Sequence, residues 1–221
     1  MSDKTLNELK EEILLLMDYN SPTERRRELE EVLERYKADF IGLNVLHHFY
    51  SFLPEAQEDG ITILRTLAQK EGTFLFSAST FIDNYVYIAT SERAELLGTC
   101  KEGFWETEVL DFFGYTSRED FITKHRETSE SPEYTPVCLD DTLCPVCAVV
   151  NGEMHTFGCP VEICPWCGGQ LTNCGCRFAK LGIDKLDKDA DIDLFFELVT
   201  KKGRIPYNIK QRPVFLRNLE K

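Results

Sequence analysis

The stretch from residue 144 to residue 176 holds the side chains whose types and spacing could do chemistry. It reads CPVCAVVNGEMHTFGCPVEICPWCGGQLTNCGC and contains seven of the nine cysteines and one of the four histidines. The eight side chains form four close pairs: Cys144 with Cys147, His155 with Cys159, Cys164 with Cys167, and Cys174 with Cys176. Thiolates and imidazoles are the ligands that Zn²⁺ prefers, four around each ion. The stretch therefore predicts a metal-binding module.

Two of the pairs are Cys-x-x-Cys turns, each of which presents two sulfurs on one side of a tight loop. Between Cys147 and Cys164 lie 16 residues, a spacing typical of a four-cysteine zinc site. We therefore predict that a first ion is bound by Cys144, Cys147, Cys164 and Cys167. The pattern CPxC…CPxCGG…CxC resembles a zinc ribbon over the range 144–176. The resemblance implies bound zinc but no particular activity, because ribbons serve in transcription factors, ribosomal proteins, enzymes and structural tails.

The remaining candidate ligands are His155, Cys159, Cys174 and Cys176, which would form a second site. With both sites formed, the order of the pairs would give a cross-brace, in which the first and third pairs bind one ion and the second and fourth pairs bind another. The alternative is that Cys159 and Cys174 are buried thiols and that His155 lies on the surface. The sequence therefore predicts one or two zinc ions.

The types of ligand indicate a structural metal rather than a catalytic one. A catalytic zinc keeps one coordination position open, whereas a site of four thiolates is closed. Dithiol redox chemistry is disfavoured because Gly168 and Gly169, after Cys167, make a poor helix start. No phosphate-binding, nucleophile-elbow or metalloprotease motif occurs. We therefore predict no catalytic residue and lean against an enzyme.

Charge and hydropathy restrict the partners and the compartment. The formal net charge is −13, but residues 200–221 carry seven basic residues and one acidic residue. No run of 18 apolar residues occurs and the N-terminus lacks signal-peptide features, so we expect no membrane contact and a cytoplasmic location. The basic segment offers possible nucleic-acid contacts through Lys201, Lys202, Arg204, Lys210 and Arg212.

The elements that must position these ligands follow from hydrophobic periodicity. Helical spacing over 5–17, 21–40, 41–52 and about 54–70 predicts a mostly helical first domain, with a capping box at Thr5 and Glu8. Residues 73–77 and 81–90 predict a small β-hairpin, and the helices are expected to return at 91–97. The predicted class is α+β. The predicted boundaries are a domain over 1–127, a linker over 128–137, a zinc-ribbon-like module over 138–180, and a C-terminal helix with a basic tail over 181–221.

These features together favour an interaction protein with structural zinc. The acidic body points to another protein as the partner, as in an adaptor, an inhibitor or an immunity-type protein. A nucleic-acid-binding regulator that uses the zinc module and the basic tail is the alternative. A third hypothesis is an enzyme with an undetected active site in the helical domain.

Overall fold

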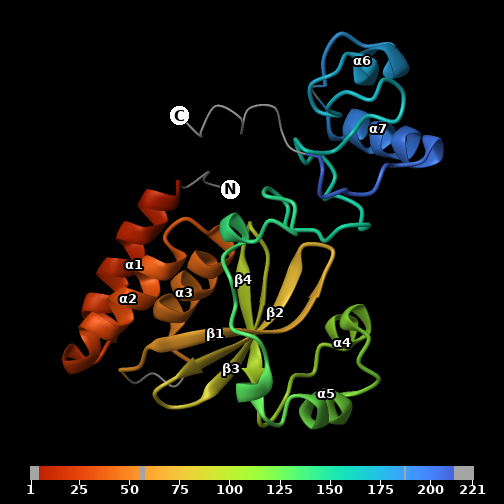
Figure 1. Ribbon diagram of the computed structural model, residues 1–221. Coiled ribbons are helices and arrows are strands. Elements are labelled where there is room, and N and C mark those ends of the chain that lie inside the picture. Colours follow the sequence, from red (N-terminus) through yellow and green to blue (C-terminus); the bar gives the residue numbers. More distant parts are fainter. Residues whose placement is uncertain (1–4, 55–57, 187, 212–221) are drawn as a thin grey trace. The chain divides into compact units, whose positions relative to one another are not determined.

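The computed structural model describes residues 5–54, 58–186 and 188–211 (Figure 1). The chain divides into two compact units, residues 1–140 and residues 141–221. None of the helices in the described part is both long and apolar enough to cross a bilayer. Helices and an antiparallel sheet occur together, with a helix near the C-terminus, so the predicted α+β class is confirmed.

The first helix of unit 1 begins where the sequence predicts. α1 (Leu6–Asn20) follows Thr5, whose hydroxyl accepts a hydrogen bond from the Glu8 N–H at 3.3 Å. The Glu8 carboxylate in turn accepts from the Thr5 N–H at 2.7 Å. This reciprocal pair satisfies two of the N–H groups that a helix start leaves unpaired, so the predicted capping box is confirmed.

Two more helices follow α1 in unit 1. α2 (Arg26–Tyr36) comes directly after a short 3-10 turn (Thr23–Arg25). α3 (Phe40–Phe52) begins after Asp39, whose buried carboxylate accepts a hydrogen bond from the Gly42 N–H at 2.8 Å. Most of the apolar residues of α3 are buried, as expected for a helix that is apolar nearly all round.

The sheet of unit 1 is an antiparallel meander, in which each strand pairs with the next along the chain. The predicted hairpin forms its central pair. The strands are β1 (Ile61–Lys70), β2 (Thr73–Thr80), β3 (Asn84–Ala89) and β4 (Ala94–Thr99).

Two segments that the periodicity assigned to helices are strands, and local turn chemistry explains both. Four of the six residues 61–66 are β-branched, which favours a strand. Glu71 and Gly72, with φ of 51° and 74°, form a two-residue turn of the kind that matches the twist of paired strands. In the second segment, the Thr90 hydroxyl accepts from the N–H groups of Glu92 and Arg93 and closes the turn into β4. The helix predictions for 61–70 and 91–97 were therefore wrong.

Side chains alternate between the two faces of the sheet. Tyr85 faces α3, where its ring lies 6.1 Å from that of Phe49. Leu75 and Val86 face the other way and pack in a cluster with Phe104. Figure 1 shows α1, α2 and α3 on one side of the sheet and two short helices on the other. These short helices are α4 (Thr107–Phe113) and α5 (Arg118–Lys124).

The segment predicted as a linker, 128–137, packs as part of unit 1. Tyr134 is buried, and its ring centroid lies 4.7 Å from that of Phe76. Its N–H donates to the carbonyl of Leu64, and its hydroxyl donates to the Asp39 carboxylate at 2.9 Å. The segment was predicted as a linker because most of its residues are polar, and the burial of Tyr134 was not anticipated. Two 3-10 turns lie in or near it, Thr128–Glu130 and Val137–Leu139.

Unit 2 holds the cysteine-rich stretch and the C-terminal helix together. The predicted module over 138–180 and the closing segment over 181–221 therefore share one compact unit that begins at residue 141. Its helices are α6 (Cys176–Leu181) and α7 (Asp189–Lys202). α7 ends at Gly203, whose φ of 98° a residue with a side chain rarely adopts.

Candidate metal centres

The first Cys-x-x-Cys turn is held by its own backbone. The Cys144 N–H donates to the carbonyl of Val149, and the Ala148 N–H donates back to the carbonyl of Cys144, both at 2.9 Å. Ala148 has a φ of 58°, so the chain reverses immediately after Cys147. The Sγ atoms of Cys144 and Cys147 lie within 4.8 Å of each other.

The second turn repeats this backbone arrangement. The Cys164 N–H donates to the carbonyl of Gly169 at 2.7 Å, and the Gly168 N–H donates to the carbonyl of Cys164 at 2.9 Å. Gly168 takes the place of Ala148, with a φ of 73°. Glycine adopts this conformation without the steric cost that a Cβ brings. Both turns are therefore preformed half-sites.

A first group of ligand atoms comes from Cys144, Cys147, His155 and Cys159. All four residues are buried, and their ligand atoms lie within 4.8 Å of one another. The Cys147 Sγ lies 3.3 Å from the His155 Nδ1, and the Cys144 Sγ lies 3.8 Å from the Cys159 Sγ. The imidazole thus faces the sulfurs through Nδ1.

A second group comes from Cys164, Cys167, Cys174 and Cys176, again with ligand atoms within 4.8 Å of one another. Here only Cys164 is buried, while Cys167 is exposed and the other two are half-buried. Cys176 is also the first residue of α6, so the start of that helix is part of the group.

The structure brings together all eight predicted ligands but groups them differently from the prediction. Each Cys-x-x-Cys turn joins the pair that follows it in the chain, so Cys147 lies with His155 and Cys167 lies with Cys174. The ribbon-like set of Cys144, Cys147, Cys164 and Cys167 is not formed, so the cross-brace that includes this set is not formed either. Short loops explain the difference, because closing a loop to the adjacent pair costs less entropy than closing one to the pair beyond it.

The electrostatics of the first group point to a cation. Hydrogen bonds with Cys144 and Cys159 hold the pKa of Cys147 well below its usual range, while hydrogen bonds with Cys144 and Cys147 raise the pKa of Cys159. Burial lowers the pKa of His155, but the facing cysteines Cys144 and Cys147 outweigh burial and raise it to about 10. Several sulfurs packed this closely cannot all ionise unless positive charge lies among them.

The thiols of the second group also shift one another's pKa values, although this group lies nearer to the solvent. The N–H of Gly169 lowers the pKa of the Cys167 thiol. Hydrogen bonding to Cys167 raises the pKa of Cys176 to about 12. The two opposite shifts again describe thiols that compete for negative charge, a competition that a bound metal ion removes.

A buried ion pair that the sequence did not reveal lies beside the first group. The Arg204 Nε donates to the Glu162 carboxylate at 2.7 Å, and its Nη2 donates to the carbonyl of His155 at 2.6 Å. The Glu162 side chain is 1% exposed. Its backbone N–H donates to the carbonyl of Cys159, and its own carbonyl accepts from the Leu171 N–H. Glu162 thereby links the loops of the two groups.

Tyr207, which follows α7, packs against the loop that holds the first ligand group. The Tyr207 N–H donates to the carbonyl of Glu153, and its own carbonyl accepts from the Gly152 N–H, both at 2.8 Å. Its hydroxyl donates to the carbonyl of Leu143 at 3.0 Å, and its ring packs edge-on against His155. The sequence predicted only a basic tail after the C-terminal helix, and nothing in it marked Tyr207 as a contact.

The residues predicted to contact nucleic acid differ in their exposure to solvent. Lys201, Lys202 and Lys210 are exposed. Arg204 is half-buried in its ion pair with Glu162, so its guanidinium does not face solvent as a phosphate contact would. Arg212 lies outside the described residues.

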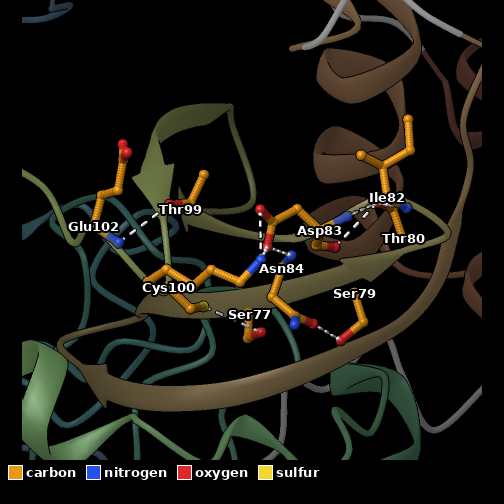
Figure 2. Close-up of polar contacts among 10 residues, drawn as sticks. Ser77, Ser79, Thr80, Ile82, Asp83, Asn84, Thr99, Cys100 and Glu102 are labelled. Carbon is orange, nitrogen blue, oxygen red and sulfur yellow. Dashed lines mark hydrogen bonds and ion pairs between the residues drawn. The ribbon is translucent and has the colours of Figure 1, made fainter.

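Cys100, in unit 1, has no part in either group. Its thiol donates to the Ser77 hydroxyl at 3.4 Å, and burial raises its pKa to about 11. Figure 2 shows it within a polar cluster at the end of β4, near the Asn84 side chain, whose Oδ1 accepts a hydrogen bond from the Ser79 hydroxyl. A buried thiol with a raised pKa is a poor nucleophile.

The two groups can each complete a four-coordinate site, one with three sulfurs and a nitrogen and one with four sulfurs. Both donor sets suit a borderline-soft divalent metal ion and leave no position for a substrate. Comparison of the chain with protein-family models, curated proteins and solved structures finds no significant match. The chemistry of unit 2 therefore has to be argued from its own residues.

Proposed function

We propose that this protein binds two zinc ions with structural roles and uses the scaffold to bind another protein. The observation that supports the metal proposal is the presence of two separate tetrads of ligand atoms, each within 4.8 Å. Among its described residues, unit 2 has one helix of 6 residues, one of 14 residues, and no strand longer than an isolated bridge. Such a small amount of regular secondary structure provides little stability, and metal coordination would supply more.

Zinc suits these tetrads better than the alternatives. Magnesium and calcium prefer oxygen ligands, which neither tetrad offers. Iron is also bound by four cysteines in some proteins, but a mixed set of three cysteines and one histidine is a common structural zinc site. Each tetrad is closed, so the ions would hold loops together rather than activate water.

The pairing of ligands gives the metal proposal a sharp test. Under the sequential grouping, Cys159→Ser and Cys176→Ser each lose one ion and keep the other. The double variant Cys159→Ser/Cys176→Ser separates the two groupings: it loses both ions under the sequential grouping, whereas under a ribbon-like grouping it keeps the ion bound by Cys144 and Cys164. Native mass spectrometry gives the number of ions, and elemental analysis gives their identity. A wild-type chain that carries no zinc after purification in zinc-containing medium would refute the proposal.

An acidic surface with exposed apolar side chains supports a protein partner. On α1, Leu15 and Tyr19 are 61% and 82% exposed and lie four residues apart, on one face of the helix. Glu11 and Asp18 are exposed on the same helix. Such a face would suit a partner that combines basic and apolar side chains, because charge complementarity steers association and apolar burial stabilises it.

Cross-linking with the full chain as bait tests the partner proposal. We expect a Leu15→Ser/Tyr19→Ser variant to lose a cross-linked partner, while Leu194→Ser, at an apolar site in unit 2 that is 48% exposed, retains it. Equal capture by all three chains would contradict a role for α1. Binding to nucleic acid remains a second candidate through Lys201, Lys202 and Lys210. The burial of Arg204 against Glu162 weakens that candidate.

A further inference from the structure

A pocket of about 480 Å³ lies in unit 2 between the loop of the second ligand group, α6 and α7. Its wall is mostly apolar and includes Phe157, Phe178, Ile192 and Phe195. Its volume lies within the range of about 300–1,000 Å³ that is typical of sites for small organic ligands. Figure 1 shows the two helices that form part of its wall.

The charged residues that line this pocket have the opposite sign to the net charge of the chain. The protein has a net charge of −13, yet the charged residues that line the pocket in the described part of the chain are both cations, Arg177 and Lys185. Arg177 donates to the carbonyl of Thr172 and stacks over the Phe178 ring at 4.6 Å. It forms no ion pair with any described carboxylate, so its charge is not neutralised there.

An apolar cavity with a cationic guanidinium at its edge selects for one chemical class. The apolar body of a ligand would bury against the aromatic wall, and an anionic group would bind the guanidinium. A neutral ligand would gain only the first of these interactions. A cationic ligand would be repelled.

We propose that this pocket is a binding site for a small apolar organic acid, whose carboxylate or sulfonate pairs with Arg177. The volume of the cavity favours a free small molecule over a peptide segment, which needs a longer groove. The site rests on the proposed function in one respect: Thr172 and α6 are held in place by the second ligand group.

Two fluorescent probes separate the apolar contribution from the charged one. The probe 8-anilino-1-naphthalenesulfonate carries an apolar body and one negative charge, and N-phenyl-1-naphthylamine is its neutral analogue. Both are titrated into the full chain after zinc loading, with zinc content and circular dichroism measured on the same samples. We expect the sulfonate to bind one molecule per chain at least tenfold more tightly than the neutral probe.

Matched variants locate the binding. We expect Arg177→Met/Lys185→Met to weaken binding of the sulfonate at least tenfold. Lys201→Met/Lys202→Met makes the same change in net charge on exposed residues away from the pocket, and should change binding less than twofold. Equal effects from the two variants would overturn the proposal, because they would show a response to net charge alone.

A second pair of variants keeps the proposal testable if the first fails to fold. Ile192 is 43% exposed and lines the pocket, whereas Leu194 is 48% exposed on the same helix and does not line it. Ile192→Asp should weaken binding of the sulfonate at least tenfold, and Leu194→Asp should leave it within twofold. Binding that survives Ile192→Asp would place the probe elsewhere and overturn the assignment.

Competition identifies the kind of ligand. We expect 1-naphthaleneacetate to displace the sulfonate probe and 1-naphthaleneacetamide to fail. Displacement by an acidic aromatic peptide but by no small acid would overturn the choice of ligand. If the chain holds two zinc ions but does not bind the sulfonate probe, the proposed ligand site is refuted and the metal proposal stands. If the chain takes up no zinc during loading but still binds the probe, the metal proposal is refuted and the ligand site stands.

Discussion

Replacing Arg204 with methionine tests whether the buried ion pair stabilises unit 2. The charged atoms of Arg204 and Glu162 lie 2.7 Å apart, and their side chains are 12% and 1% exposed. At this separation and an effective dielectric constant of about 20, the attraction is about 6 kcal/mol, which offsets several kcal/mol of desolvation. Methionine retains much of the apolar stem but leaves the carboxylate buried without a partner.

We expect Arg204→Met to lower the free energy of unfolding of unit 2 by about 4 kcal/mol, because removing one member of a buried pair costs roughly 3–5 kcal/mol. The variant also loses the hydrogen bond to the carbonyl of His155. The double variant Arg204→Met/Glu162→Leu should recover a large part of the loss, since no unpaired charge remains.

The assay is unfolding in guanidinium chloride at a fixed concentration of free zinc, because bound metal contributes to the apparent stability. A Trp105→Phe background leaves Trp166 as the one tryptophan of the chain, so fluorescence reports on unit 2. Lys202→Met is the control, an exposed residue with the same change of charge. A loss of less than about 1 kcal/mol for Arg204→Met would refute the reasoning, because it would mean that water reaches the carboxylate.

Further predictions concern a turn, a close contact, pH and metal. Gly168→Ala should destabilise the second metal site by only about 1 kcal/mol, because its φ of 73° costs a Cβ that much while no atom lies within 4 Å, and zinc-chelator competition measures the loss. Gly60→Ala should cost unit 1 about 1–3 kcal/mol in denaturant unfolding, since the added Cβ would lie 2.4 Å from a methyl of Leu29. Burial lowers the pKa of His48 and His125 below the ordinary value of 6.5, so the unfolded chain binds protons more readily. The unfolding free energy of unit 1 should therefore decrease as pH falls below 6.5, and replacing both residues with glutamine should flatten that part of the pH profile; an unchanged profile would contradict the assignment. The fragment 1–140 should fold alone, and a zinc chelator should leave its melting temperature unchanged while lowering the zinc content of the full chain.

The features that the sequence predicts correctly are those set by residues close together in the chain. The capping box joins Thr5 to Glu8, three positions further along the chain. The ligand residues were identifiable in the same way, because Cys-x-x-Cys turns are local. What failed was the identity of β1, whose register with β2 depends on a turn at Glu71 that periodicity does not detect.

The grouping of ligands was not predictable from spacing alone. Spacing allows Cys147 to join either the next pair or the one after, and the choice depends on how the loops between them fold. Two hydrogen bonds between residues far apart in the chain contribute to that choice, one from Arg204 to Glu162 and one from Tyr207 to Leu143. Neither Glu162 nor Tyr207 carries a local signal, since a lone glutamate or tyrosine ordinarily lies on the surface or in a core.

The contact between Tyr207 and Leu143 has a consequence for how unit 2 can be reused. Leu143, near the start of the unit, and Tyr207, near the end of its described part, lie one tyrosine side chain apart. A segment whose two ends meet can be spliced into a surface loop of an unrelated host without pulling the host apart. We therefore expect that residues 141–211 can be transplanted into such a loop, whose folding would then depend on metal bound by the two ligand groups.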